Sequence, residues 1–367
     1  MKNFGYYMPV RTFYGTDCVK AHQDVLAQFG KKALIVTGRH SAKANGAQAD
    51  ITSALEAVGC SWVLFDQVGE NPDLETVVAA GKLAQEEQVD FVIGIGGGSP
   101  MDAAKAISVL AANPGAPSDI LFNDPKAKTL PVVEIPTTAG TGSEVTQYAI
   151  ITLHEKRTKN GIVQPLFASV SFLDPKYMDV LSEKVTNNTA VDAMSHLVES
   201  YLNTAASQLS KEMAKIGLSY WKECIPALKA RTYTAETREK LMMASAIGGM
   251  VIAQTSTSIP HGLGYFLTYE KGIPHGRANG MLMQAYLELF DKEDENVKAV
   301  LDCLGLASTE EMGQLMKDVL DCPETFTAED LAYYTKRALE TPQKLLTFPC
   351  YKLDEKDVLS VYEKSLL

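Results

Sequence analysis

The feature that most constrains the fold is a change of hydrophobic pattern near residue 180. Before it, short apolar, β-branched runs alternate with stretches of helical period. The strand-like runs cover residues 33–37, 62–65, 90–95 and 131–135, later 148–152 and 168–173, and the helix-like stretches lie near 42–58, 73–88 and 100–112. Because apolar strands separated by helices are typical of a parallel sheet covered on both faces, we expect an α/β domain here.

After residue 180 the strand pattern stops and only amphipathic helical patterns remain. They predict helices near 182–203, 207–227, 235–254, 277–290, 293–304, 309–320, 327–340 and 354–365. A chain of 367 residues also has room for two domains at about 150 residues each. We therefore expect an α/β domain over residues 1–180 followed by an all-α domain over 181–367.

Charge and composition exclude several classes of partner. The chain is 46% hydrophobic and 22% charged, with a net charge of −11 and no block of five like charges. This pattern argues against nucleic acid and acidic membrane surfaces. The charge-free stretch 241–269 is mainly apolar only over 241–253, which is too short to span a bilayer. Six cysteines without a CxxC pair, and an N-terminus without a signal-peptide pattern, predict a cytoplasmic protein.

Two glycine-rich loops follow neighbouring strand-like runs. The first, Gly96-Gly97-Gly98-Ser99-Pro100, leads into a helix that carries Asp102. Glycine lets backbone N–H groups approach a phosphate, and a helix N-terminus adds partial positive charge. The motif is neither a Walker A loop nor GxGxxG, and a tight turn alone would also account for it.

The second loop, residues 136–146, interleaves glycines with the hydroxyls of Thr137, Thr138, Thr141 and Ser143. Two such loops at the carboxyl ends of adjacent parallel strands favour a nucleotide site.

A third turn bears on the choice of nucleotide. The run 33–37 is followed by Gly38, Arg39, His40 and Ser41, without a carboxylate. An acidic residue there accepts the ribose 2′-hydroxyl and repels a 2′-phosphate, so its absence and the nearby Arg39 favour NADP(H) over NAD(H). The alternative is that Gly38 and Arg39 merely form a turn.

Three of the six histidines fall in one pattern with an aspartate. Asp192 and His196 are spaced i,i+4 on a predicted helix, and His261 and His275 each lie between Pro and Gly. Three imidazoles and a carboxylate would suit Fe(II) or Zn(II). The alternative is a surface Asp–His pair and two histidines packed in the core.

Taken together, these motifs resemble the iron-dependent (group III) alcohol dehydrogenases, of the butanol, propanediol and lactaldehyde-reducing kind. The resemblance covers nearly the whole chain and rests on 96–102, on 136–144, and on the Asp192/His196 and His261/His275 pairs. It implies a Rossmann-like dinucleotide-binding domain, a helical domain, and a nicotinamide cofactor beside a divalent metal. It also implies a homodimer, a small alcohol or aldehyde as substrate, and hydride transfer.

The resemblance assigns roles residue by residue. The metal ligands would be Asp192, His196, His261 and His275, with His261 and His275 also at the catalytic centre. The cofactor would be bound at Gly38, Arg39, Ser41, Gly96, Gly97, Gly98, Ser99, Asp102, Thr137, Thr138, Ser143 and Lys159. Some members carry a proton-relaying histidine four residues after the third ligand, where this chain has Tyr265. Either the phenol or water takes that role, or no relay is needed.

Two rival functions remain open on the sequence. One is a dehydroquinate-synthase-like lyase or a glycerol-dehydrogenase-like enzyme with zinc, and the other is a non-catalytic nucleotide or metal sensor. The absence of an Arg/Lys cluster near the metal motifs argues against a polyanionic substrate. The tyrosine-rich segment 4–14 predicts a strand that either pairs with a second subunit or forms an edge of its own domain.

Overall fold

The structure is a computed structural model that describes residues 3–367, and the chain divides into two units. The first, here the α/β unit, comprises Met8–Thr138 and Gly142–Leu181. The second, here the helical unit, comprises Ser182–Leu367, the three residues Ala139–Thr141 and the segment that ends at Tyr7. Each is described separately.

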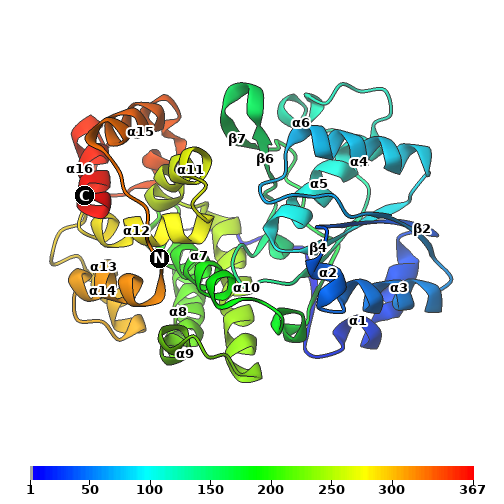
Figure 1. The fold of residues 1–367 in the computed structure, drawn as a ribbon, viewed down its shortest axis with the longest axis horizontal. Helices are drawn as coiled ribbons and strands as arrows, with labels where there is room; N and C mark the ends of the chain where they lie inside the picture. Colours follow the sequence, from blue (N-terminus) through cyan, green and yellow to red (C-terminus); the bar gives the residue numbers. More distant parts are fainter. Residues whose placement is uncertain (1–2) are drawn as a thin grey trace. The chain divides into compact units, whose positions relative to one another are not determined.

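A six-stranded sheet forms the centre of the α/β unit (Figure 1). Its strand order is β1-β8-β5-β4-β2-β3, and every pairing is parallel. The strands are β1 (Arg11–Tyr14), β2 (Lys32–Thr37), β3 (Ser61–Phe65), β4 (Phe91–Gly96), β5 (Val132–Pro136) and β8 (Val170–Leu173). The predicted parallel α/β fold is therefore confirmed.

Strand alternation explains why both faces of this sheet are covered. Along β2, Ala33 and Ile35 enter one apolar cluster, while Leu34 and Val36 enter the other. Helices α1 (Cys18–Ala21) and α3 (Ala47–Ala57) cover the first face, and α4 (Leu74–Glu86) and α5 (Gly98–Ala112) cover the second (Figure 1). Short elements complete the unit: η1 (Gln23–Gln28), α2 (Ser41–Ala44), α6 (Ile120–Asn123), η2 (Ser143–Val145), η3 (His154–Lys156) and η4 (Pro175–Met178).

Two predicted strands differ from the observed ones in their pairing or extent. The run predicted at 148–152 forms β6 (Ile150–Leu153), which pairs antiparallel with β7 (Thr158–Gly161) and not with the main sheet. Only Arg11–Tyr14 of the segment 4–14 is a strand, and it pairs with β8 at the edge of its own sheet. The edge-strand alternative therefore describes this segment within one chain.

The helical unit is arranged around α7 (Glu183–Leu202), which α8, α10 and α12 contact. Most of α7 is buried, including its polar residues Asp192, His196 and Glu199. The other helices are α8 (Gln208–Glu223), α9 (Ile225–Ala230), α10 (Ala235–Thr255), α11 (Ile259–Lys271), α12 (His275–Leu287), α13 (Glu295–Leu304), α14 (Thr309–Val319), α15 (Ala328–Glu340), η5 (Pro342–Thr347) and α16 (Glu355–Leu366). A helix surrounded on all sides places its polar groups where they need protein partners.

The sequence analysis missed α11 and merged two helices. Pro260, Gly262 and Gly264 obscure the helical pattern, but Pro260 lies in the first turn, where its missing N–H is not needed. Pro226 in turn divides the predicted helix 207–227 into α8 and α9.

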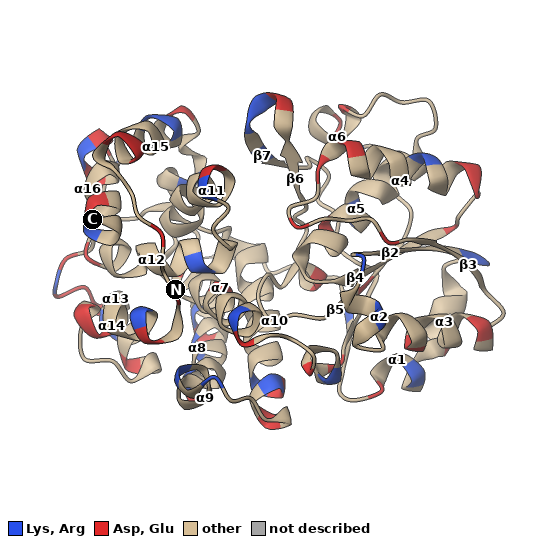
Figure 2. Cartoon of the chain, viewed as in Figure 1, with Lys and Arg blue, Asp and Glu red and all other residues tan. Residues whose placement is uncertain are grey.

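Acidic and basic residues are interspersed along both units (Figure 2). Among residues 3–367, none of the helices combines the length and apolarity that a bilayer span requires.

Candidate metal and nucleotide sites

Three side chains from three helices converge in the helical unit. Asp192 lies in the middle of α7, His261 is the third residue of α11, and His275 is the first residue of α12. Each offers one ligand atom, and these atoms all lie within 4.8 Å of one another. Oδ1 of Asp192 is 3.6 Å from Nε2 of His261 and 3.9 Å from Nε2 of His275. One carboxylate oxygen and two imidazole nitrogens form a donor set that suits Fe(II) or Zn(II).

His196, the fourth predicted ligand, lies beside this group of three. It is one helical turn after Asp192, as the i,i+4 spacing predicts, and its ring stacks on that of His261 with centroids 4.5 Å apart. Its Nδ1 lies 3.2 Å from the carbonyl oxygen of Gly140. A carbonyl only accepts, so Nδ1 carries the hydrogen and Nε2 keeps its lone pair. Burial lowers the pKa of His196 to about 4, so the ring is neutral at pH 7.

Charge interactions oppose the effect of burial on the pKa of two predicted ligands, His261 and Asp192. Burial disfavours protonated His261, but the carboxylates of Glu199 and Asp192 raise its pKa to about 9. Burial also disfavours ionised Asp192, but the three histidines, His196 foremost, hold its pKa well below the usual range. The group therefore contains an ionised carboxylate, as a cation site requires.

Sequence reasoning missed two polar residues of this site. Nδ2 of Asn279 lies 3.1 Å from Oδ1 of Asp192, 3.2 Å from Nε2 of His261 and 3.4 Å from Nε2 of His275. Glu199 contacts the far nitrogen of His261, with 2.6 Å between Oε1 and Nδ1. Their spacing is the signal that was available: Asn279 is four residues after His275, and Glu199 is seven after Asp192.

Tyr265 lies on α11 one turn after His261, and its ring stacks on that of His275. The side chain of His275 is 26% exposed, whereas those of Asp192 and His261 are 4% and 3% exposed. Access to the group is therefore from the side of His275 and Tyr265.

In the α/β unit, the predicted nucleotide loops adjoin one another. β4 pairs with β5, so the loops after them begin side by side, and the N–H of Thr137 donates to the carbonyl oxygen of Gly96 at 2.8 Å. A Cβ on Gly97 would lie 3.2 Å from Oγ1 of Thr138, so glycine permits this close approach. Gly98 and Ser99 form the first turn of α5.

The turn after β2 ends at the same edge of the sheet. β2 and β4 are neighbours, while the chain runs from β2 out to β3 and then back across to β4. This is the point where strand order reverses, at which open α/β sheets bind ligands. Gly38 follows β2 there, and Arg39 and Ser41 are both exposed.

The other predicted cofactor residues form two hydrogen-bonded sets. Oγ of Ser143 donates to Oδ1 of Asp102 at 2.6 Å, and Oδ2 of Asp102 accepts from the N–H of Ile150. Nζ of Lys159 donates to Oδ1 of Asn71 at 2.7 Å, and the N–H of Asn71 donates to Oγ of Ser99. Asn71, which links Lys159 to the first loop, carried no sequence signal that we recognised.

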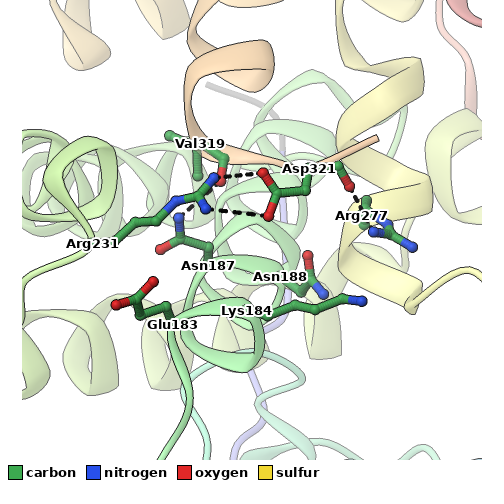
Figure 3. Close-up of a pocket in the computed structure, with 8 residues that line it drawn as sticks. All are labelled: Glu183, Lys184, Asn187, Asn188, Arg231, Arg277, Val319 and Asp321. Carbon is green, nitrogen blue, oxygen red and sulfur yellow. Dashed lines mark hydrogen bonds and ion pairs between the residues drawn. The ribbon is translucent and has the colours of Figure 1, made fainter. Parts of the chain in front are cut away.

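A small pocket near the start of α7 is separate from these sites (Figure 3). The guanidinium of Arg231 pairs there with both carboxylate oxygens of Asp321, and Arg277 donates to the Asp321 carbonyl oxygen. These groups bind one another, so the pocket adds no donor set to the metal group.

Comparison with known protein families covers most of the chain. The family described as iron-containing alcohol dehydrogenase matches residues 9–175. The C-terminal family of Fe-containing alcohol dehydrogenases matches residues 186–364.

Individual relatives agree with these families. Alcohol dehydrogenase 4 of Saccharomyces cerevisiae strain YJM789 is 33% identical over 76% of this chain and 74% of its own length. Lactaldehyde reductase of Escherichia coli K12 is 31% identical over 74% and 72%. A crystal structure of an iron-containing alcohol dehydrogenase from Thermotoga maritima superposes with a TM-score of 0.91 and 36% identity, covering 99% of both chains.

Proposed function

The chain belongs to the iron-containing alcohol dehydrogenase family and is an oxidoreductase, and from that premise we propose its detailed activity. It interconverts a small aliphatic alcohol and aldehyde by hydride transfer, with Fe(II) at the histidine group and NADP(H), in preference to NAD(H), at the glycine loops. The observation that carries the proposal is the convergence of Asp192, His261 and His275 to within 4.8 Å. Zn(II) is the alternative metal, since the donor set suits both ions.

The residues present fit a divalent metal. Asp192, His261 and His275 each turn one donor atom toward a common point, and His196 adds a neutral imidazole with its lone pair on Nε2. When bound, the metal supplies a Lewis acid for the substrate oxygen. Asn279 steadies the group by donating to Asp192. His275 and Tyr265 form the accessible side, and the stacking of Tyr265 on His275 supports the proposal that this phenol, rather than water, passes the hydroxyl proton between substrate and solvent.

The loops of the α/β unit fit a nicotinamide dinucleotide, which supplies or accepts the hydride. Backbone N–H groups of Gly97, Gly98 and Ser99 at the start of α5, next to Gly96, hold the pyrophosphate. Thr137, Thr138, Asp102, Ser143 and Lys159 contribute the nicotinamide side, and Gly38, Arg39 and Ser41 the ribose 2′-phosphate. NADP(H) is favoured because no carboxylate stands at Gly38.

We further propose that the protein is a cytoplasmic homodimer whose two domains meet near residue 180 in the sequence. β1 has one neighbour, β8, among the strands of the described chain, which leaves its other edge available for a second copy in a homodimer. A cytoplasmic location agrees with six free thiols. The domains divide near residue 180.

The test is aldehyde-dependent oxidation of NADPH and NADH by chelator-stripped protein, with and without anaerobically added Fe(II) or Zn(II). We expect turnover of short aldehydes that requires Fe(II) and prefers NADPH. Absence of turnover with every metal, cofactor and aldehyde would favour the lyase or sensor alternatives.

A matched pair of variants connects turnover to the proposed ligands. His275→Ala is expected to lose bound metal and activity together while retaining NADPH binding. His154→Ala, which removes an exposed histidine outside the group, is the control and should retain both. Full activity in His275→Ala would refute the ligand assignment.

A further inference from the structure

Glu199 is a fully buried carboxylate that neither the predicted ligand set nor the proposed reaction uses. It lies on α7, three residues after His196, and its side chain is 0% exposed. A buried carboxylate is costly unless each oxygen has a hydrogen-bond partner. The hydrogen-bond partners of Glu199 therefore indicate the structural role of this buried carboxylate.

Its two oxygens hold two parts of α11. Oε2 accepts from the N–H of Ser258 at 2.6 Å, at the residue that precedes the helix. Oε1 lies 2.6 Å from Nδ1 of His261, in the first turn of the same helix. One carboxylate thus fixes both the start of α11 and the imidazole that α11 carries.

The turn that brings Ser258 to Glu199 has an unusual backbone. Ser256 has φ 66° and ψ 178°, a region that favours glycine and that other residues adopt only when their surroundings impose it. Here Oγ1 of Thr255 donates to the Ser256 carbonyl, and Nζ of Lys344 donates to Oγ of Ser256, both at 2.9 Å. The strained turn and Glu199 together direct α11 toward α7.

We propose that Glu199 is a positioning residue for the metal group, acting through His261; this inference rests on the metal site of the proposed function. An ionised carboxylate only accepts hydrogen bonds, so it keeps the hydrogen of His261 on Nδ1. Metal binding releases the other ring proton, and Nε2, which lies 3.6 Å from Oδ1 of Asp192, then presents its lone pair to the metal. Such outer carboxylates orient ligating imidazoles and increase their basicity.

The test measures metal affinity directly. Co(II) is titrated into metal-free wild type and Glu199→Gln against a chelator of known affinity, and the visible spectrum of each Co(II) protein is recorded. Gln keeps the volume but offers one acceptor for two donors, so we expect Co(II) affinity to fall about 10–100-fold and the spectrum to change. Far-UV circular dichroism of the metal-free proteins monitors folding.

Ser200→Ala is the matched control. Ser200 is equally buried at the next position of α7, and its hydroxyl lies 2.9 Å from Oγ1 of Thr255 and not within hydrogen-bond distance of a predicted ligand in the described chain. Its Co(II) affinity should equal that of wild type. Equal loss in both variants, or wild-type affinity in Glu199→Gln, would overturn the proposal.

A second variant and the Co(II) binding of wild type separate failure of the Glu199 proposal from failure of the metal site. If Glu199→Gln does not fold, Glu199→Asp retains the charge but withdraws it by one methylene, and wild-type affinity in that variant would equally refute the proposal. If wild type itself takes up no Co(II), the metal site of the proposed function fails. If wild type binds Co(II) and Glu199→Gln binds it equally well, only the role of Glu199 fails.

Discussion

The rings of Tyr265 and His275 stack at 27° with their centroids 5.3 Å apart. Tyr265 belongs to α11 and His275 to α12, so the contact joins two of the three helices that carry the metal group. It also places a phenol next to the most exposed of the three converging side chains. A Phe at position 265 would lack the hydroxyl but keep the ring that stacks on His275.

Tyr265→Phe tests the proton relay. Because the ring stays stacked, we expect metal content to remain at the wild-type level. Loss of the hydroxyl should lower kcat about 10²-fold, the usual contribution of a positioned acid or base. Steady-state kinetics with NADPH and a short aldehyde, together with metal analysis, measures both quantities.

The control for this change is Tyr269→Phe, one turn farther along α11. It should leave kcat and metal content unchanged. Wild-type kcat in Tyr265→Phe would mean that water exchanges the proton directly.

Gly276→Ala tests the close approach of α12 to α7. A Cβ at Gly276 would lie 2.0 Å from the backbone oxygen of Asn188 and 2.7 Å from Cβ of Asp192. Backbone cannot move aside as a flexible side chain can, so we expect a loss of about 3 kcal/mol or more in stability. The displaced α12 should also carry His275 away from Asp192 and reduce metal content. Thermal unfolding and metal analysis report these effects.

Gly69→Ala is the matched substitution, since a Cβ there has no neighbour within 4 Å. It should change neither Tm nor metal content. A Gly276→Ala protein with wild-type Tm would show that the two helices tolerate a wider separation.

Gly38→Asp tests the proposed preference for NADP(H). A Cβ at Gly38 would lie 3.4 Å from the carbonyl oxygen of Val68, an ordinary contact, so the side chain should fit. Its carboxylate should repel the 2′-phosphate and raise KM for NADPH about 10–100-fold, while improving use of NADH. Gly38→Asn adds the same volume without charge and should change the NADPH preference much less. Equal effects of Asp and Asn would assign the change to size.

Glu144→Gln tests a pH effect on stability. Burial raises the pKa of Glu144 from 4.5 to about 7. The folded protein therefore keeps a proton that the unfolded chain releases, and Glu144 lowers stability as pH rises from about 4.5 to about 7. Gln cannot ionise, so the free energy of unfolding of Glu144→Gln should increase relative to that of wild type across this pH window, by up to about 3 kcal/mol.

Thermal unfolding of both proteins between pH 4.5 and 8 measures this difference. Glu155→Gln, which changes an exposed carboxylate, should track wild type throughout. A constant difference between Glu144→Gln and wild type at all pH values would show that Glu144 titrates normally.

The parallel sheet was predictable because strand and helix periods are local properties. Residues 33–36 and 91–95 carry no polar side chain, and such short runs between helical stretches are typical of a parallel sheet. Helix α11 was not predictable in the same way. Gly264 lies where a Cβ would come 2.4 Å from Oδ1 of Asn279, so it serves the packing of α11 on α12 and weakens the local helical signal.

In the candidate site too, helical spacing along the sequence predicts some features and packing between distant segments decides the others. Asp192, His196 and Glu199 share one face of α7 because helical geometry brings positions i, i+4 and i+7 together. The i,i+4 spacing singled out Asp192 and His196 from the sequence, but Glu199 was missed. Which atoms face them depends on contacts distant in the chain: Glu199 and His261 are 62 residues apart. Local periodicity contains no information about such contacts, because packing of α7, α11 and α12 sets them. The sequence therefore determined most of the helices, the loops and the types of the candidate ligands, while the tertiary structure decided that Glu199 contacts His261 and that Asn279 contacts Asp192.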